Sequence, residues 1–404
     1  MPGSWAFRMP PNQHFLNVIG HVGRKPAPRS TGAGHYDAPA ATRGDTEMPI
    51  AGQRDPDQTR AALTAWLGSR TGAVDVEITD LVVPQSSGFS NETFLFSASW
   101  TDLGGRTAHD LVLRSQPQDY ALFPEIDLLA QQYGSMKLLG EHTEVPVAHM
   151  RFAEADTSVL GQPFFVMDRL YGRVPGDVPP YTESGFVMDM TPAERARQWR
   201  NGIEAMTKVA RVDWRAVGFD FLDKPHHGRL GGEQRRNYFA NFLAWAGAGN
   251  PQPVADPAWA WLAANWPDND VLELCWGDAR PGNQMYDDDG NVLGIFDWEM
   301  VSIGDAESDL GWWLFLQLFH TEGSGRALPD GIPDKDETVA IWSAFMGREP
   351  RHVDFYMRLA GFHFTLVMLR ISAMMKLLSP DAWSPAYETH NPVMTLTKQL
   401  IGIA

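Results

Sequence analysis

The chain has 404 residues, of which 44% are hydrophobic, so it is long enough for two domains or lobes, and disorder of the whole chain is excluded. Its 50 acidic and 33 basic residues give a net charge of −17, which argues against a nucleic-acid-binding or anionic-membrane-binding surface and permits a cationic substrate. Cys275 is the only cysteine, so no intramolecular disulfide can form, and a reducing cytoplasmic location is expected.

Residues 1–50 are rich in proline and glycine and show little periodicity, which predicts a flexible N-terminal extension. A transit peptide and an alternative start at Met48 are other interpretations of this stretch, and no secretory signal is expected. No apolar run reaches the ~20 residues that a bilayer-spanning helix needs. The first regular element is a helix over residues 57–67, indicated by its apolar spacing and by Gly68 as a stop.

Strands are predicted on both sides of a polar turn within residues 74–100, where the turn reads SSGFSNE. Backbone N–H groups and hydroxyls in such a turn can bind phosphate oxygens, although taken alone an ordinary hairpin turn is the better interpretation. A further strand ends at Arg114, and a helix is predicted over residues 122–139. Short strands follow at residues 145–148 and 163–167, and a Gly- and Pro-rich loop at residues 171–180.

The second half of the chain is predicted to be mainly helical, with helices over residues 192–212, 234–246, 258–266, 335–346 and 353–378. The aromatic residues of the second and third of these helices belong to the core or line a substrate pocket. His226 and His227 are adjacent, so their side chains should diverge, and no third metal ligand is evident in the sequence. A solvated loop is therefore predicted there. Asp305 and Asp309 open another helix, where a structural role is favoured over a catalytic one.

The most informative stretch is residues 272–299, which place Asp278, Asn283 and Asp297 around a short hairpin. The turn of this hairpin contains Asp289-Gly290 between two apolar runs, a strong hairpin signal because glycine accepts a positive φ. Asn283 and Asp297 should then lie together at the open end, with Asp278 one loop away. Two carboxylates and an amide are hard oxygen ligands that suit Mg²⁺, whose octahedron is completed by water and substrate phosphates.

This stretch resembles the catalytic core of the aminoglycoside phosphotransferase and choline kinase group within the kinase-like superfamily. The group has the pattern H-G-D-x-x-x-x-N, followed by a hydrophobic run that ends in D-x-E. The residues that fall on this pattern are Gly277, Asp278, Asn283, Asp297 and Glu299. Trp276 stands where the group usually has His. The string IFDWEMVSIGDAESDLGWW is most similar to the kinase-like domains attached to acyl-CoA dehydrogenases.

The resemblance extends over residues 60–375 and implies an α+β, bilobal protein-kinase-like fold. A small, mainly antiparallel β N-lobe with a helix would occupy residues 51–168 and bind the nucleotide. A larger, mainly α-helical C-lobe would occupy residues 169–404 and contain the catalytic and acceptor-binding residues. The implied activity is that of a small-molecule kinase, with ATP and Mg²⁺ as cofactors and a small molecule with a hydroxyl group as acceptor.

Roles in catalysis follow from the same resemblance. Asp278 would accept the proton of the acceptor hydroxyl or orient that hydroxyl. Asn283 and Asp297 would hold Mg²⁺, and Glu299 would bind a second Mg²⁺ directly or through water. Arg280 could contact the transferring phosphate or the acceptor, and a surface arginine without a role is the alternative.

Nucleotide binding is implied at three places in the N-terminal part. Residues that match the phosphate-binding turn G-x-S-N-x-T are Gly88, Phe89, Ser90 and Asn91. Arg114 stands where kinase-like folds place a cation that pairs with the nucleotide phosphates. The hinge that passes the adenine falls on Met167, Asp168 and Leu170. The acid that orients the strand cation in this fold falls on Gln132, and either Gln132 itself or a nearby acid, Glu125 or Asp127, could take over that function.

Two other functions are compatible with this sequence. Trp276, Gln132 and Arg211 depart from the family pattern, which would suit a pseudokinase that binds nucleotide and serves as a sensor or scaffold. An antibiotic-inactivating phosphotransferase acting on aminoglycosides or macrolides is the other. Because the group includes kinases of many small molecules, the acceptor is expected only to be a hydroxylated metabolite, with an acyl-CoA-like compound suggested by analogy.

Overall fold

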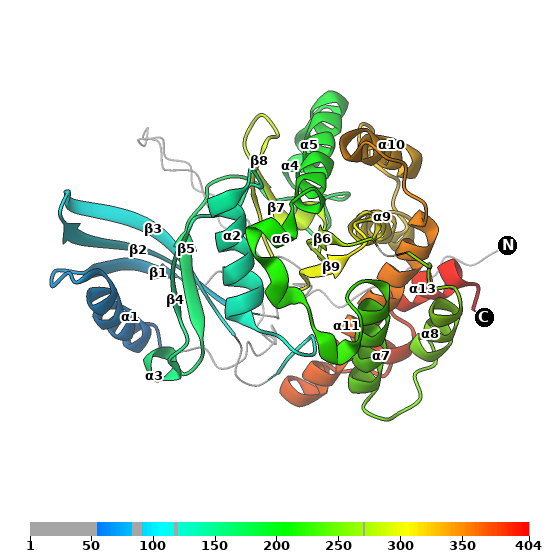
Figure 1. Cartoon of the computed structure of the whole chain (residues 1–404), viewed down its shortest axis with the longest axis horizontal. Helices are drawn as coiled ribbons and strands as arrows, with labels where there is room; N and C mark the ends of the chain where they lie inside the picture. The colour runs from blue at the N-terminus through cyan, green and yellow to red at the C-terminus, as the bar shows by residue number, and fades with distance from the viewer. Residues whose placement is uncertain (1–54, 83–90, 117–119, 270, 404) are drawn as a thin grey trace, which may run out of the picture.

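A small sheet-containing lobe and a larger helical lobe make up the protein, as the computed structural model shows (Figure 1). The structure describes residues 55–82, 91–116, 120–269 and 271–403. The small lobe contains an antiparallel five-stranded sheet, and long helices dominate the other lobe. The bilobal α+β architecture expected from the sequence is therefore confirmed.

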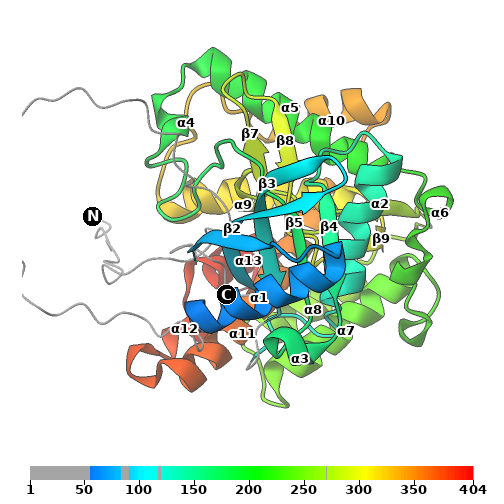
Figure 2. The same ribbon diagram turned by 90° about the vertical axis from the view of Figure 1, so that its left-hand side faces the viewer.

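The sheet of the small lobe has the strand order β1-β2-β3-β5-β4, and all neighbouring strands are antiparallel. Its strands are β1 (Glu77–Val82), β2 (Glu92–Asp102), β3 (Gly105–Ser115), β4 (Met150–Glu154) and β5 (Phe164–Asp168). Helix α1 (Pro56–Thr71) crosses one face of this sheet (Figure 2). Trp66 of α1 packs edge-on against Phe164, with ring centroids 4.7 Å apart. The apolar spacing of α1 thus supplies the core on this face.

Two predicted elements of this lobe have different bounds in the structure. Helical structure begins only at Leu128, with a π-helical turn, η1 (Leu128–Gly134), that continues into α2 (Ser135–His142). The side chain of Asp127 caps this start by accepting the N–H of Ala130 at 2.9 Å, so residues 120–127 lie outside the helix. Residues 145–148 form no strand of the sheet, and Pro146 instead accepts the N–H of Ile295 in the catalytic hairpin at 2.8 Å.

Helix α11 (Val353–Leu378) is the central element of the helical lobe. The other long helices of this lobe are α5 (Pro192–Ala210), α7 (Gly232–Gly247), α8 (Ala255–Ala264), α9 (Glu307–His320), α10 (Lys335–Met346) and α13 (Pro392–Ile401). Helix α11 packs against α7, α8, α9 and α13. It is the one described helix that is long and apolar enough to cross a membrane, and 67% of its most apolar window is buried inside the protein. This burial is that of a core helix.

Two small antiparallel ribbons lie between the sheet and the long helices (Figure 1). One pairs β6 (Glu273–Cys275) with β9 (Ser302–Gly304), and the other pairs β7 (Gln284–Tyr286) with β8 (Val292–Ile295). The remaining short helices are α3 (Thr157–Leu160), α4 (Phe186–Asp189), α6 (Trp214–Val217), η2 (Phe219–Leu222), η3 (Pro225–His227), η4 (Pro281–Asn283), η5 (Glu322–Ser324), η6 (Pro380–Ala382) and α12 (Ala386–Thr389). The residues singled out from the sequence lie in the segments that join these strands, and they are Asp278, Asn283, Asp297 and Glu299.

Candidate active site

The hairpin β7–β8 brings Asn283 and Asp297 together, as the spacing predicts. Its turn is held by Asp287, whose carboxylate accepts the N–H groups of residues 289 and 291 at 2.9 and 2.8 Å. Gly290 in the same turn has φ +80°, a value that favours glycine. At the open end, the N–H of Phe296 donates to the carbonyl of Asn283 at 2.9 Å, directly before Asp297.

The loop that carries Asp278 is held by hydrogen bonds to Asp309 of α9. The carboxylate of Asp309 accepts the backbone N–H groups of Trp276 at 2.7 Å and Gly277 at 2.8 Å. Burial raises the pKa of Asp309 to about 6, although these two hydrogen bonds oppose that shift. Gly277 has φ +96°, and a Cβ there would overlap with the backbone of Met300. The structural role predicted for Asp309 is confirmed by these contacts.

Trp276, which stands where the family usually has His, joins the catalytic loop to the hairpin. Its indole N–H donates to the carbonyl of Phe296 at 2.8 Å, and its side chain is fully buried. Because Phe296 immediately precedes Asp297, this hydrogen bond fixes the position of Asp297 relative to the loop. The departure at residue 276 therefore retains a side-chain donor at this junction.

Three side chains donate hydrogen bonds to the carboxylate of Asp278. Asn283 donates through Nδ2 at 2.6 Å, and Arg280 donates through Nε at 3.0 and 3.1 Å to the two oxygens. The indole N–H of Trp312 in α9 donates to Oδ1 at 2.6 Å. The side chain of Asp278 is 14% exposed. These contacts fix the orientation of a carboxylate that can still be reached by a small molecule.

Arg280 is buried between two carboxylates, so the surface-arginine interpretation is wrong. Its Nη1 donates to Oδ2 of Asp177, and its Nε donates to Asp278. The other oxygen of Asp177 pairs with Nε2 of the buried His320 at 3.3 Å. Burial opposes ionisation of Asp177, but Arg280 and His320 hold its pKa below the usual value. Arg280 is thus held by Asp177 and hydrogen-bonded to Asp278. Sequence reasoning missed Asp177, His320 and Trp312, which no local pattern connects to the loop.

Asn283 and Asp297 present oxygen atoms that fit a divalent cation. Oδ1 of Asn283 and Oδ1 of Asp297 are both buried, and neither has a hydrogen-bond partner among the described residues. Burial raises the pKa of Asp297, while the nearby charges of Arg114 and Arg280 oppose the shift. Two buried oxygens without partners are costly in an apolar setting and favourable as Mg²⁺ ligands. The residues present therefore fit the expected metal.

Glu299 and Asn91 link the hairpin to the sheet of the small lobe. The Nδ2 of Asn91, which directly precedes β2, donates to Oε2 of Glu299 at 3.4 Å. The carboxyl groups of Glu299 and Asp297 are in hydrogen-bonding contact. Glu299 thus lies beside the candidate metal site. The other three residues of the predicted phosphate-binding turn, Gly88, Phe89 and Ser90, lie outside the described residues.

Arg114 lies near the candidate metal site from the side of the sheet. It sits on β3 between Thr93 of β2 and Phe165 of β5, and its side chain is buried. Its positive charge opposes the rise in the pKa of Asp297 that burial causes, so the guanidinium lies near this carboxylate. Gln132 is also buried, on η1.

The two acids considered as substitutes for the family's helix acid are engaged elsewhere. Asp127 caps η1. Glu125 is bound by two histidines of the helical lobe, His226 and His227. Both acids therefore have other partners in the structure, and a role for Gln132 in orienting Arg114 stays a prediction.

The predicted hinge residues lie at the end of β5. Met167 is buried opposite Val112 of β3, and Leu170 packs close to the β7–β8 ribbon at Gly294. The carboxylate of Asp168 accepts hydrogen bonds from Arg151 at 2.6 and 3.1 Å, and its backbone N–H donates to residue 149 at 2.9 Å. Adenine recognition by this strand stays a prediction.

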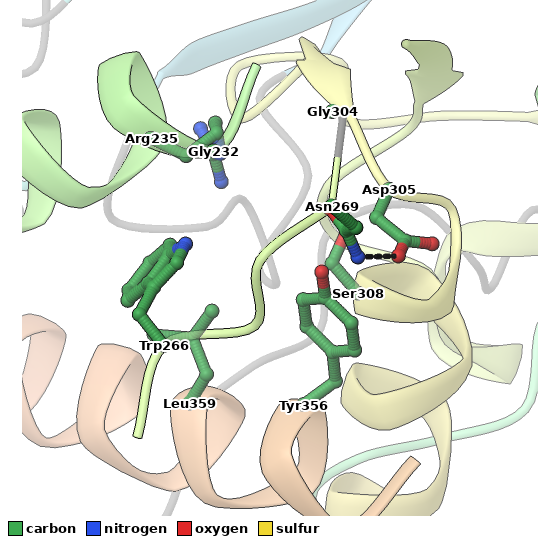
Figure 3. A pocket seen from close by; sticks show the side chains of 9 residues that line it. All are labelled: Gly232, Arg235, Trp266, Asn269, Gly304, Asp305, Ser308, Tyr356 and Leu359. Carbon is green, nitrogen blue, oxygen red and sulfur yellow. Dashed lines mark hydrogen bonds between the residues drawn. The ribbon is translucent and has the colours of Figure 1, made fainter. Parts of the chain in front are cut away.

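A cavity of about 20 Å³ lies in the helical lobe, between the starts of α7 and α9 and helix α11 (Figure 3). The residues that line it are Gly232, Arg235, Trp266, Asn269, Gly304, Asp305, Ser308, Tyr356 and Leu359. Asn269 and Asp305 are hydrogen-bonded across it at 2.7 Å. A space of this size holds about one water molecule, so it cannot receive a metabolite.

The fold and these residues together define a kinase-like phosphotransferase. The model of the phosphotransferase enzyme family, APH, matches residues 82–332, which is more than half of the chain. The protein therefore belongs to this family.

The similar proteins include acyl-CoA dehydrogenase family member 11 of Rattus norvegicus, which is 26% identical over 295 residues, covering 70% of this chain and 35% of the relative. The Homo sapiens protein of the same name is 25% identical over 283 residues, covering 67% and 33%. The chain thus spans about a third of the length of these relatives.

Among solved structures, a Ralstonia eutropha protein provisionally described as an aminoglycoside phosphotransferase has a TM-score of 0.61 and 23% identity, covering 85% of this chain and 98% of that one. A ternary complex of aminoglycoside phosphotransferase APH(4)-Ia with ADP and hygromycin B has a TM-score of 0.51 and 14% identity, covering 84% and 98%. These likenesses establish the fold.

Proposed function

We propose that the protein transfers the γ-phosphoryl group of ATP to a hydroxyl group of a small molecule. The observation that carries this proposal is the convergence of Asp278, Asn283 and Asp297, with Asp278 accessible and the Oδ1 atoms of the other two unpartnered. A scaffold protein without chemistry would gain nothing from keeping buried, unpaired oxygens beside an oriented carboxylate. Membership of a phosphotransferase family supports the same conclusion.

In the proposed reaction, the acceptor hydroxyl lies against Asp278. Its oxygen forms a bond to the γ-phosphorus while the bond from that phosphorus to the β,γ-bridging oxygen breaks, and ADP leaves with the electron pair. The hydroxyl proton passes to the carboxylate of Asp278 as the transfer is completed. Arg280 and Trp312 hold this carboxylate in place, so the geometry is set before the acceptor arrives.

The phosphates would lie between the hairpin and the sheet. Asn283 and Asp297, with Glu299 beside them, would hold Mg²⁺, which would supply positive charge that neutralises the phosphate groups. Arg114 is placed on β3 to add a fixed cation on the side of the sheet. The positive charge of Arg114 opposes the rise in the pKa of Asp297 that burial causes.

The names of the relatives suggest which class of acceptor to test first. Because the relatives are named acyl-CoA dehydrogenases, hydroxyacyl thioesters are the first acceptors to test. Hygromycin B is bound by APH(4)-Ia, so aminoglycosides form the comparison set. Transfer to hydroxyacyl thioesters and not to aminoglycosides is expected. The opposite result would identify an antibiotic-inactivating enzyme and would leave the phosphotransfer proposal intact.

Nucleotide binding is tested with a matched pair of variants on the same hairpin. Asp297 has φ +62°, a conformation that asparagine tolerates, so Asp297→Asn removes the charge and keeps the backbone. Asp288→Asn changes a 94% exposed acid in the turn and is the control. Calorimetry should show Mg²⁺-dependent ATP binding in the parent chain and in Asp288→Asn, and at least about tenfold weaker binding in Asp297→Asn. Equal binding in all three would overturn the metal site.

Catalysis is tested separately with Asp278→Asn. This variant should bind Mg-ATP like the parent chain and lose about 10²–10⁴-fold in turnover with any acceptor found. A fully active variant would remove Asp278 from its role. If ATP binds but no hydroxylated acceptor is phosphorylated, the catalytic half of the proposal fails and a nucleotide-binding sensor or scaffold becomes the better description.

A further inference from the structure

A second cluster of ligand-type side chains lies outside the active site. The imidazole Nε2 of His226 lies 3.2 and 3.1 Å from the two carboxylate oxygens of Glu125, and Nε2 of His227 lies 3.0 Å from Oε2. The three ligand atoms all lie within 4.8 Å of one another. The adjacent histidines therefore converge on a third group that is a hundred residues away in sequence, and the solvated-loop prediction is wrong for His227, which is buried.

These separations are close to those of a tetrahedral metal site. Zinc binds imidazole nitrogen at about 2.0–2.1 Å and carboxylate oxygen at about 2.0–2.2 Å, so two ligands of one tetrahedron lie about 3.3–3.5 Å apart. The N···O distances of 3.0–3.2 Å would need to open by only a few tenths of an ångström. Two histidines and one glutamate leave the fourth position for water, and His226 and Glu125 are exposed enough to admit an ion from solvent.

His227 has the outer hydrogen bond that a metal-binding histidine needs. Its Nδ1 lies 3.0 Å from the side-chain amide of Asn241 on α7. An amide can present either nitrogen or oxygen, so Asn241 can accept a proton from Nδ1 when Nε2 binds a cation. Such a partner fixes the tautomer and the ring orientation of a ligating histidine. His227 is thus held ready in the position from which its Nε2 faces Glu125.

Glu125 has an unusual backbone conformation, and the segment that contains it contacts the helical lobe. Glu125 has φ +59°, which is uncommon for a residue other than glycine, so its surroundings hold it in place. It lies in the segment 120–127, between β3 and η1. Phe123 of this segment packs against Phe242 of α7 with ring centroids 6.0 Å apart. Arg370 of α11 donates to the carbonyl of Ala121 at 3.2 and 3.1 Å.

We propose that Glu125, His226 and His227 form a binding site for a divalent transition-metal ion such as Zn²⁺, which fastens segment 120–127 to the helical lobe. This site is separate from the Mg²⁺ ligands proposed for phosphotransfer and does not depend on that function. Imidazole and carboxylate ligands together favour zinc over magnesium, which prefers oxygen ligands alone. An ion at this site would fix the chain directly before η1, the helix that carries Gln132.

Lys224 competes with a metal ion for the carboxylate of Glu125. Its ammonium lies 3.5 Å from Oε2 of Glu125 and competes for the same oxygen. The side chain is 25% exposed and flexible, so it can turn into solvent when the ion binds. This competition gives a prediction that a purely hydrogen-bonded cluster does not make: Lys224→Met should tighten zinc binding several-fold, because it removes a positive charge and frees a ligand oxygen.

The test is a zinc titration of the full chain against a chromophoric chelator, in excess Mg²⁺ so that the carboxylates of the active site are occupied. We expect one tight site, weakened at least about 100-fold by His226→Ala and by Glu125→Gln, and about 10–100-fold by Asn241→Ala. Co²⁺ should give the intense visible absorption of a tetrahedral site in the parent chain and lose it in His226→Ala. His226 and Glu125 are chosen because they are exposed, so their loss should leave the fold intact.

His142→Ala, at the exposed end of α2, is the matched control and should bind zinc like the parent chain. The proposal is overturned if His226→Ala and His142→Ala bind zinc equally well. It is also overturned if Glu125→Gln leaves both the zinc affinity and the Co²⁺ spectrum unchanged, because the histidines would then bind metal as ordinary surface groups. Weaker zinc binding in Lys224→Met would contradict the assigned role of Glu125.

Discussion

Asp309 provides the sharpest test of how the catalytic loop is held, because its pKa is raised to about 6 from an ordinary value of 3.8. A carboxyl group with a higher pKa in the folded state binds protons more tightly when the chain is folded. Its contribution to stability is therefore fully present below about pH 3.8 and is lost as the pH rises through about 6. The perturbation is Asp309→Asn, which keeps the shape and removes the titration.

The magnitude follows from the two pKa values. The full shift of about 2 units corresponds to about 3 kcal/mol, and about 1.3 kcal/mol of it falls between pH 5 and pH 7. The wild-type chain should therefore lose about 1.3 kcal/mol of unfolding free energy relative to Asp309→Asn over this interval. At any one pH the variant also lacks a second acceptor for the N–H groups of Trp276 and Gly277, which costs about 1–3 kcal/mol.

The assay is urea unfolding followed by tryptophan fluorescence at pH 5, 6 and 7 for both chains. Asp336→Asn, an exposed substitution in the first turn of α10, is the control for the loss of one acidic charge and should show no such difference. A free-energy difference between wild type and Asp309→Asn that stays constant over these pH values, or that changes in favour of wild type as the pH rises, would refute the reasoning.

Three further predictions concern the groups around Asp278. Asp177→Ala leaves Arg280 buried with one partner fewer and should lower the unfolding free energy by about 3–5 kcal/mol in urea titrations, and Asp177→Asn should cost less; equal, small losses would show that the ion pair is not structural. Trp312→Phe removes one donor to Asp278 and should lower kcat by about tenfold or more with ATP affinity unchanged, whereas an unchanged kcat would contradict the orienting role. Trp276→Phe should cost about 1 kcal/mol of stability through the lost hydrogen bond to residue 296, and a variant as stable as wild type would show that this bond contributes nothing.

Local patterns in the sequence were sufficient for several helices. The bounds of α10 match the predicted range of residues 335–346, and Asp334 and Glu337 form a reciprocal capping box at its start. Helix α5 likewise begins at a capping box formed by Thr191 and Glu194. Such ends are defined by residues three positions apart, so they are readable without any tertiary information. The helix predicted over residues 122–139 starts later than expected, because Asp127, which lies inside that range, caps the helical structure that begins at Leu128.

Part of the candidate site could likewise be predicted from local sequence, and part could not. The loop and hairpin that place Asp278, Asn283 and Asp297 lie within about 20 residues of chain, so turn chemistry alone brings them together. The sequence identified Arg280 as a candidate, but it did not show that Arg280 forms a buried ion pair. Its partner Asp177 is about 100 residues away, and only packing of the helical lobe decides that the guanidinium is buried rather than exposed.

The sequence by itself determined the family, the two-lobed fold and the identity of the metal-binding and catalytic candidates, because these depend on short motifs and on helix and strand periodicity. Only the tertiary structure decided which side chains hold those candidates, and it brought Glu125 of the small lobe to His226 and His227 of the large one. Adjacent histidines diverge in an extended chain, whereas the short helical turn η3 aims both of these at one carboxylate. Contacts over such separations depend on the packing of whole elements, which no local pattern encodes.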